Sequence, residues 1–307
     1  MTTRFETPIT GWFAANARDL PWRHPDAGAW PILVSEIMLQ QTPVARVLPA
    51  YRAWLDRWPT VAAQAGATPA DAVRQWDRLG YPRRAIRLHA SARLIMQWHG
   101  GEVPASVPAL RELPGIGSYT AAAVASFAFG QRHAVLDTNV RRVLARLISG
   151  QELATGSVSA AETALAESLL PPAGDRRAAR WSAAVMELGA LVCTAARPAC
   201  DRCPVATDCA WRLRGSPPGP PARRVQPYAG SDRQCRGALL ATLRSASGPL
   251  PAGALDACWP DPDQRSRVLT TLITDGLAAH HDSGLIGLPG DDYPANPDTR
   301  GGSGPPR

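Results

Sequence analysis

Apolar side chains recur every three or four residues along most of the chain between Thr10 and Leu213, with short polar or proline-containing breaks between the runs. This spacing is typical of helices that bury one face. It predicts helices at Pro31–Gln41, Ala45–Arg57, Asp71–Leu79, Arg83–Trp98, Ser118–Phe129, Thr138–Ser149, Ser159–Leu170 and Arg177–Leu191. Strand patterns are almost absent, and only Ala134–Leu136 is expected to be extended. We therefore predict an all-α body.

The helical pattern stops at Arg214–Pro227, which holds five prolines in fourteen residues and is predicted to be a stiff linker. Residues 228–288 then form a smaller unit, the C-terminal module. Its pattern predicts three helices and a hairpin, at Ser231–Ala246, Ala252–Ala257, Asp263–Asp275 and Leu277–Leu288. We interpret this order as winged-helix-like. Residues 289–307 are rich in Gly, Pro and Asp and are predicted to be a disordered tail.

Composition argues against a membrane protein. Hydrophobic residues make up 45% of the 307 residues and charged residues 19%, which is enough for a substantial core. The longest nearly apolar run, Ala121–Phe129, is far shorter than the ~20 residues that a membrane-spanning helix needs. Met1–Trp12 shows no basic-then-apolar signal pattern, so we expect a cytoplasmic protein whose cysteines are reduced.

The positive charge of the chain comes entirely from arginine. The net charge of +7 and the pI of about 9.5 permit a polyanionic partner. All 33 basic side chains are arginine, and the sequence contains no lysine. A compositional bias of the genome explains this, but its chemical consequence holds whatever the cause. No lysine side chain can form a Schiff base or act as a nucleophile.

Four of the six cysteines share one short stretch with the spacing C-x6-C-x2-C-x5-C: Cys193, Cys200, Cys203 and Cys209. In a reducing compartment, such a group is typical of a metal site. Four thiolates suit either structural zinc or a [4Fe–4S] cluster, and ligand chemistry alone leaves both open. Cys235 and Cys258 fall outside the spacing, and we expect them to be buried small hydrophobic residues.

The segment Leu113–Ala121 (LPGIGSYTA) lies between two helical patterns. Gly115 and Gly117 permit a tight turn, and the helix predicted to begin at Ser118 directs its first N–H groups out of that turn. A helix start of this kind binds anions such as phosphate. A plain connection between two helices is the alternative, because the pattern G-x-G alone is weakly specific.

One acidic residue is placed for acid catalysis. Glu36 shares a helix face with Ile32 and Leu33. Burial among apolar side chains raises the pKa of a carboxyl, as a general acid at neutral pH requires. Most helical glutamates are instead solvated, and periodicity alone favours that alternative.

A second carboxylate, Asp137, directly precedes the predicted helix Thr138–Ser149, where aspartate is a preferred N-cap. The amide hydrogen bonds that it accepts are expected to lower its pKa and keep it ionised, so capping and catalysis are compatible. A protonated carboxyl beside an ionised one is the pair that cleavage of glycosidic bonds uses.

Several motifs agree, in order and spacing, with one known family: VSEIMLQQT (Val34–Thr42), RLGY (Arg78–Tyr81), LPGIGSYTA, VLDTNVRR (Val135–Arg142) and MELGA before Cys193. From about Gly11 to Trp211 the chain resembles the adenine DNA glycosylase (MutY) family of the endonuclease III, or helix-hairpin-helix, superfamily. The resemblance implies a helix-hairpin-helix glycosylase fold with two helical subdomains at residues 8–213. It also implies that the four spaced cysteines hold a [4Fe–4S] cluster.

The resemblance further implies a catalytic role for four residues in base excision repair. Glu36 is expected to protonate an adenine mispaired with 8-oxoguanine or guanine. Asp137 is expected to stabilise the sugar cation, or to attack it transiently, before water adds. Tyr119 is expected to orient the sugar and the acid, and Asn139 to support the site. Tyr119 stands where bifunctional relatives carry the lysine that cuts the strand. The protein is therefore expected to be monofunctional and to leave an abasic site.

Further residues are expected to contact double-stranded DNA. By the resemblance, Gln41 and Thr42 contact the opposite base and Tyr81 wedges into the stack, whereas Gly115 and Gly117 bind a phosphate. Arg197 and Arg202 in the cysteine stretch are expected to face phosphates. We expect a monomer, with no membrane partner, associated with the nucleoid.

The chain departs from the family pattern at Arg78, Pro82 and Thr138, none of which removes a catalytic group. The C-terminal module is too short and too helical for the Nudix-like domain with which family members often check for 8-oxoguanine. How the opposite base is recognised therefore stays open between the N-terminal loops and this module.

Two alternatives remain. One is a glycosylase of the same fold that acts on another mispair, such as thymine opposite guanine, although such members lack the glutamate that matches Glu36. The other is a DNA-binding regulator with an iron–sulfur sensor and a winged-helix reader. It explains the charge, the cysteines and the C-terminal module, but not Glu36 and Asp137 in their motifs.

Overall fold

The computed structural model describes residues 2–154, 156–174, 176–219 and 227–291. The chain folds into two compact units, each assembled from two stretches of sequence. The first unit contains residues 1–40 and 98–224, and the second contains residues 41–97 and 225–307. Within the described ranges, no helix is both long enough and apolar enough to cross a membrane.

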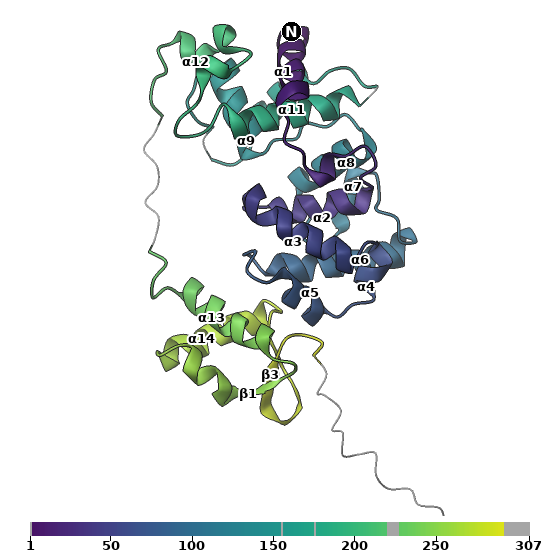
Figure 1. The fold of residues 1–307 in the computed structure, drawn as a ribbon, viewed down its shortest axis with the longest axis vertical. Helices are drawn as coiled ribbons and strands as arrows, with labels where there is room; N and C mark the ends of the chain where they lie inside the picture. Colours follow the sequence, from purple (N-terminus) through teal and green to yellow (C-terminus); the bar gives the residue numbers. More distant parts are fainter. Residues whose placement is uncertain (1, 155, 175, 220–226, 292–307) are drawn as a thin grey trace, which may run out of the picture. The chain divides into compact units, whose positions relative to one another are not determined.

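The helices of the first unit are α1 (Thr2–Asn16), α2 (Ala29–Leu39), α7 (Val107–Glu112), α8 (Ser118–Phe129), α9 (Thr138–Leu144), α10 (Ala160–Leu169), α11 (Arg177–Leu191) and α12 (Ala210–Leu213). A π-helical turn, Ala145–Ser149, continues α9. Short 3₁₀ turns are found at Pro21–Arg23, Cys200–Arg202 and Ala206–Asp208. Helices α1 and α9 pack on α11, and α2 packs on α8 (Figure 1).

The core of the first unit forms around α11. The apolar face of this helix presents Trp181, Val185 and Leu188, and it packs with Ile9 of α1 and Val143 of α9. All five side chains are at most 4% exposed. Each buried side chain of this size stabilises the fold by about 1.5–3 kcal/mol relative to leaving it in water. The packing of the three helices therefore fixes the position of α9 against α11.

Helices with strong local signals were predicted with accurate ends. Ser118–Phe129 and Arg177–Leu191 match α8 and α11 at both ends. The extended piece expected at Ala134–Leu136 belongs to no strand, because no neighbouring strand pairs with it in the described part of the first unit, and it leads directly into the cap of α9. The pattern also missed α1, which contains Pro8.

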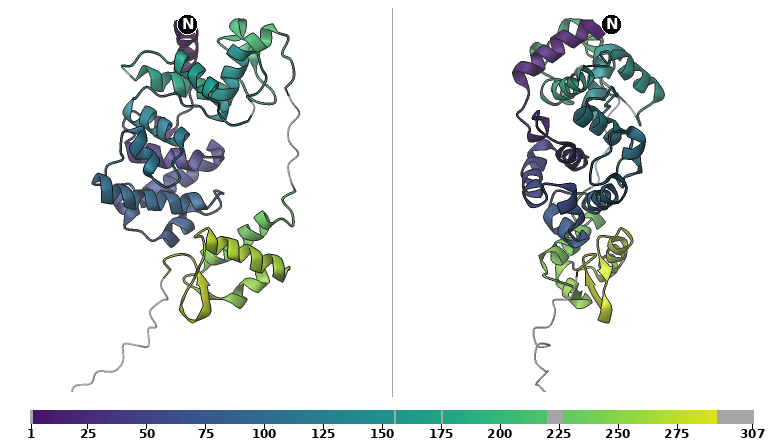
Figure 2. Two further views of the ribbon diagram at one scale, coloured as in Figure 1. Left: turned by 180° about the vertical axis from the view of Figure 1, so that it is seen from behind. Right: turned by 90° about the vertical axis from the view of Figure 1, so that its right-hand side faces the viewer.

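The second unit begins with α3 (Val44–Arg57), α4 (Val61–Ala65), α5 (Pro69–Trp76) and most of α6 (Arg83–His99). Its C-terminal part consists of α13 (Asp232–Ser245), β1 (Leu250–Pro251), a 3₁₀ helix (Ala252–Cys258), α14 (Pro262–Thr274), β2 (Ala279–His280) and β3 (Leu285–Gly287). The strands form an antiparallel sheet in the order β1-β3-β2. Figure 2 shows this sheet in yellow beside the helices of the C-terminal module.

The C-terminal module shares a core with α5. Ala70 and Val73 of α5 pack with Leu239 and Leu243 of α13 and with Leu272 of α14. The fold is thus mostly helical, as predicted, with a small C-terminal antiparallel sheet; the predicted hairpin is confirmed, and β1 was not predicted. The domain boundaries expected from the sequence stay predictions. The middle of the linker (220–226) and the tail from 292 to 307 lie outside the described residues.

One buried ionic network holds the start of the first unit to α11. Glu187 is fully buried and accepts hydrogen bonds from Nε and Nη2 of Arg18, at 2.8 and 2.7 Å, and from Nη2 of Arg23 at 2.8 Å. Burial by itself raises the pKa of Glu187, but the two arginines outweigh it and hold the pKa at about 2. The ionised form is therefore favoured in the folded state.

We expect Glu187→Gln to lower the free energy of unfolding by about 3 kcal/mol at pH 7, since it leaves buried guanidinium groups without their carboxylate. A lowered folded-state pKa stabilises the protein above the unfolded value near 4.5, and that stability is lost as the pH falls toward 2. In denaturant unfolding, the difference in the free energy of unfolding between wild type and Glu187→Gln should therefore shrink between about pH 5 and pH 3. The exposed Glu102→Gln is the control. A difference that does not change with pH would contradict this role.

Candidate active site

Glu36 is buried in the middle of α2. It is 5% exposed, and its neighbours Ser35 and Ile37 are buried as well, so the solvated alternative is wrong. Burial raises the pKa of Glu36 to about 7, and the charge of Asp137 acts in the same direction. A hydrogen bond with Tyr119 and the charge of Arg23 act against this shift. Glu36 is thus a carboxyl group that titrates close to neutral pH.

Tyr119 is the second residue of α8, the helix that packs on α2. Its phenol donates a hydrogen bond to the carboxylate of Glu36. Burial, and then the charges of Glu36 and Asp137, raise the pKa of Tyr119 well above its ordinary value. The phenol therefore stays neutral and keeps its proton as a donor beside the carboxyl.

Asp137 is the N-cap of α9, as predicted. Its Oδ1 accepts the backbone N–H of Val140 at 2.6 Å, and its Oδ2 accepts Nδ2 of Asn139 at 2.7 Å. The expected lowering of its pKa is wrong. Burial raises the pKa of Asp137 and outweighs the hydrogen bonds and the charge of Arg142, which act to lower it.

A chain of contacts connects Asp137 to the cysteine loop. Asn139, bound to Asp137, accepts Nη2 of Arg142 at 2.8 Å through its Oδ1. Nε of Arg142 donates to the carbonyl oxygen of Cys193 at 2.7 Å, and Nη2 donates to that of Gly189 at 2.7 Å. The side chains of Asn139 and Arg142 therefore connect Asp137, a predicted catalytic residue, to the backbone of Cys193.

The contact between α9 and α11 depends on a glycine. A Cβ atom at Gly189 would lie 2.7 Å from Cβ of Asn139 and 2.8 Å from the carbonyl oxygen of Asn139. Both distances are shorter than real Cβ contacts, so only glycine permits this approach. Gly189 belongs to the motif MELGA. A glycine inside a helical pattern could have indicated a close helix contact, but this role was not predicted.

Arg23 brings a positive charge to the same site. Its Nη2 is bound to Glu187, whereas its Nη1 is buried and has no hydrogen-bond partner among the described residues. Its charge lowers the pKa of Glu36, which shows that the two groups lie near each other. Arg23 and Glu187 are 164 positions apart in the sequence, so no local pattern could predict their pairing.

The glycine turn begins α8. Gly115 has a φ of +82°, a conformation that favours glycine, and Gly117 is the N-cap with open space where a Cβ would be. Nε2 of Gln40 donates to Oγ1 of Thr120 at 3.1 Å beside this turn. The helix start has no side-chain cap, so its first N–H groups face out of the turn.

The four spaced cysteines are free and partly buried. In the described part of the chain, no three His, Cys, Asp or Glu side chains are positioned to bind a metal. Nη1 of Arg146, a residue that is 1% exposed, donates to Sγ of Cys193 at 3.5 Å. Burial raises the pKa of Cys203 to about 11, and the charges of the other three cysteines add to this, so the thiols lie within electrostatic range of one another. Arg197 is exposed on the same loop.

The second unit holds Gln41, Thr42 and Tyr81. Arg84, which was not predicted, connects the last two: its Nη2 donates to Oγ1 of Thr42 at 2.8 Å, and its guanidinium lies 5.4 Å from the centre of the Tyr81 ring. Tyr81 is 55% exposed, and both Gln41 and Tyr81 have positive φ values, 56° and 48°. The structure therefore brings Thr42 and Tyr81 together around one buried arginine.

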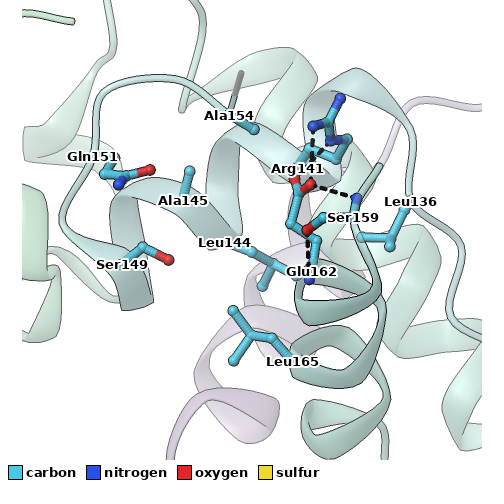
Figure 3. Close-up of a pocket in the computed structure, with 10 residues that line it drawn as sticks. All are labelled: Leu136, Arg141, Leu144, Ala145, Ser149, Gln151, Ala154, Ser159, Glu162 and Leu165. Carbon is cyan, nitrogen blue, oxygen red and sulfur yellow. Dashed lines mark hydrogen bonds and ion pairs between the residues drawn. The ribbon is translucent and has the colours of Figure 1, made fainter. Parts of the chain in front are cut away.

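A cavity of about 290 Å³ lies beside α9 and α10. Figure 3 shows the ion pair of Arg141 and Glu162 on one side of it, with Ser149 and Gln151 on the other. The side chains that line it include none of those that the sequence indicates for catalysis or DNA binding. The cavity therefore does not coincide with the residues that are expected to be catalytic.

Comparisons with known proteins agree with this geometry. Residues 34–167 match the model of the HhH-GPD superfamily base excision DNA repair proteins. The chain is 49% identical over 290 residues to an adenine DNA glycosylase of Mycolicibacterium smegmatis, covering 94% of this chain and 97% of that protein. An adenine DNA glycosylase of Mycobacterium tuberculosis (strain CDC 1551 / Oshkosh) is 48% identical over 291 residues, 94% of each chain.

A solved structure with a related fold is that of a thermostable thymine-DNA glycosylase. It is 28% identical, with a TM-score of 0.63, over 69% of this chain and 97% of that one. The identity to the adenine DNA glycosylases is much higher and extends through the C-terminal module. The chain therefore belongs to the adenine DNA glycosylase family, within the HhH-GPD superfamily of base excision DNA repair proteins.

Proposed function

We propose that this protein is a monofunctional DNA glycosylase that removes adenine mispaired with 8-oxoguanine or guanine in double-stranded DNA. Its family membership makes it an adenine DNA glycosylase of base excision repair. The observation that carries the proposal is the buried carboxyl of Glu36, with a pKa of about 7, in the same site as Tyr119 and Asp137. Loss of adenine needs an acid that still holds its proton at neutral pH.

Glu36 is the general acid. Because its pKa is raised to about 7, the carboxyl can still carry its proton at neutral pH, and this proton moves to a ring nitrogen of the adenine as the glycosidic bond breaks. Tyr119 keeps the carboxyl oriented through its hydrogen bond. Protonation makes adenine a better leaving group, and the electron pair of the bond departs with the base.

Asp137 stabilises the positive charge that develops on the sugar. Its carboxylate is fixed from one side by the amide of Val140 and by Asn139, which Arg142 holds in turn. A carboxylate held in this way needs little rearrangement when the charge appears. Water then adds to the sugar and leaves an abasic site.

The absence of lysine limits the chemistry that can occur after the base has left. A lyase step of the lysine type needs an amine that forms a Schiff base with the sugar, and this sequence has none on any side chain. Tyr119 cannot replace it, because a phenol forms no imine. We therefore infer that strand cleavage requires a separate treatment of the abasic site.

Each unit carries groups that suit a contact with DNA. The first N–H groups of α8, after Gly115 and Gly117, suit a phosphate, and Arg197 is exposed for a second one. The exposed ring of Tyr81 suits insertion beside the mispair, with Gln41 and Thr42 contacting the opposite base. Flipping the adenine costs a few kcal/mol of stacking and pairing, and a mispair lowers that cost.

We further propose that Cys193, Cys200, Cys203 and Cys209 hold a [4Fe–4S] cluster. The residues around the loop fit an anionic group: Arg146 is buried and forms no ion pair with a carboxylate in the described ranges, and Arg142 lies beside it. Such a cluster would supply covalent cross-links that fix the loop carrying Arg197.

The sheet order β1-β3-β2 with α13 and α14 supports a winged-helix-like C-terminal module.

Single-turnover assays on duplexes with adenine opposite 8-oxoguanine, guanine or thymine should release adenine fastest opposite 8-oxoguanine. Strand breaks should appear only after alkali. Glu36→Gln should lower the rate by about 100- to 10,000-fold while DNA binding is retained. Thymine opposite guanine belongs in the same panel because of the related thymine-DNA glycosylase structure. Release of thymine, or no adenine release from any duplex, would discard the proposal.

The rate of adenine release should fall as the pH rises through about 7, because the raised pKa of Glu36 keeps the acid protonated only below that value. We expect a decline approaching tenfold per pH unit at the alkaline end, measured under single-turnover conditions with saturating enzyme. Binding of the same duplex, measured in parallel, should change little over this range. A rate that stays constant up to about pH 9 would exclude Glu36 as the acid.

Protein purified without oxygen should contain about four iron atoms per chain and little zinc, with the broad visible absorbance of an iron–sulfur cluster. Cys203→Ala should abolish the iron content and the absorbance. Cys258→Ala, outside the spacing, is the matched control and should keep both. Zinc in place of iron would overturn the assignment without affecting the case for Glu36.

A further inference from the structure

The loop that carries Tyr81 has an unusual backbone. Of the five residues from Asp77 to Tyr81, three have positive φ values: Asp77 at 42°, Gly80 at 92° and Tyr81 at 48°. Residues other than glycine are strained in this region, and such conformations persist only where the surroundings hold them. We call residues 77–81 the wedge loop. Its shape therefore depends on contacts made by other parts of the second unit.

Side chains hold the carbonyl groups of the wedge loop from several elements. The carbonyl of Gly80 accepts Nε1 of Trp76 at 2.9 Å and Nη2 of Arg84 at 2.8 Å. The carbonyl of Arg78 accepts Nη2 of Arg46. The carbonyl of Asp77, the first strained residue, accepts a hydrogen bond from Nη1 of Arg244. Arg244 lies on α13, so the last of these donors comes from the C-terminal module.

The C-terminal module also binds the chain directly after the wedge loop. Asp275, at the end of α14, pairs with Arg83 at 3.2 Å and with Arg236 of α13 at 2.7 Å. The carbonyl of Ala246 accepts Nη2 of Arg74, before the loop, at 3.1 Å. The module thus contacts the chain on both sides of the loop, in addition to the core that α5 shares with α13.

The charges of the C-terminal module do not suit a direct reader of DNA. Residues 228–288 contain five arginines and six aspartates, a net formal charge of −1. Each of the five arginines is already engaged within the protein: Arg233 with Tyr228, Arg236 with Asp275, Arg244 with Asp77, Arg265 with Asp256 and Arg267 with Asp232. A net negative charge disfavours binding to phosphates, so the module is better suited to an indirect role.

We propose that Arg244 is a positioning residue through which the C-terminal module holds the wedge loop in the conformation that recognises the mispair. The module thereby sets substrate recognition without touching DNA. This inference rests on the proposed role of Tyr81. Losing one anchor lowers the fraction of molecules with a competent loop, and apparent affinity falls in proportion to that fraction.

The test uses the full chain and four variants of it. Arg244→Met keeps the aliphatic stem but removes the donor, Arg244→Lys restores one donor, and Arg267→Met removes an exposed arginine elsewhere in the module. Asp275→Asn weakens the ion pair between Asp275 and Arg83 and leaves the hydrogen bond of Arg244 to the carbonyl of Asp77 in place. Hydrogen–deuterium exchange of amides 77–83 reports the loop, and single-turnover kinetics over a range of enzyme concentrations separate binding from excision.

Arg244→Met and Asp275→Asn should speed exchange at 77–83 and raise the apparent Kd for the adenine:8-oxoguanine duplex by about tenfold, with the rate at saturation nearly unchanged. Arg244→Lys should recover most of the affinity, and Arg267→Met should match wild type. Unaltered exchange, or faster exchange with unaltered Kd, overturns the inference. If the wild-type protein releases no adenine, the proposed function is overturned instead. The exchange measurement then still shows whether Arg244 holds the wedge loop.

Discussion

Removing carboxylates from water is the constraint on which both the stability and the chemistry of the first unit depend. Glu36, Asp137 and Glu187 all lose hydration on folding, and burial raises the pKa of each. Their partners then decide the outcome. Two guanidinium groups return Glu187 to a firmly ionised state, whereas the phenol hydrogen bond and the charge of Arg23 only partly offset the burial of Glu36. One environment thus produces a structural anion and a neutral-pH acid a short distance apart.

The chain uses arginine wherever a positive charge is needed, and this shapes how its loops are held. A guanidinium offers five N–H donors in a rigid plane, so one side chain can bind several acceptors at once. Arg142 joins Asn139 to the cysteine loop, and Arg84 joins Thr42 to Gly80. In these positions the side chain organises backbone carbonyls rather than pairing with a carboxylate. Irregular segments are thereby fixed without regular secondary structure.

Local signals predicted much of this fold and fewer of its interactions. The cap at Asp137 and the ends of α8 and α11 followed from sequence, because capping and periodicity act over a few residues. The direction of the pKa shift of Asp137 did not, since burial is created by helices far away in the chain. The same is true of Arg23 with Glu187 and of Arg244 with Asp77, which are 164 and 167 positions apart. The pattern at Ala134–Leu136 could not show whether these residues join a sheet, because a short apolar run does not reveal whether a partner strand exists.

The glycine at position 189 has a consequence for how this enzyme can vary. The atoms that exclude a larger residue are Cβ and the carbonyl oxygen of Asn139, and the oxygen belongs to the main chain. No exchange of the side chain at 139 removes that obstacle, so a change at 189 has no compensating partner on α9. Many helix contacts tolerate a substitution on one helix when the facing residue changes as well. This contact does not, because only the hydrogen of glycine fits at position 189. Helices α9 and α11 can therefore keep this close approach only while residue 189 is glycine.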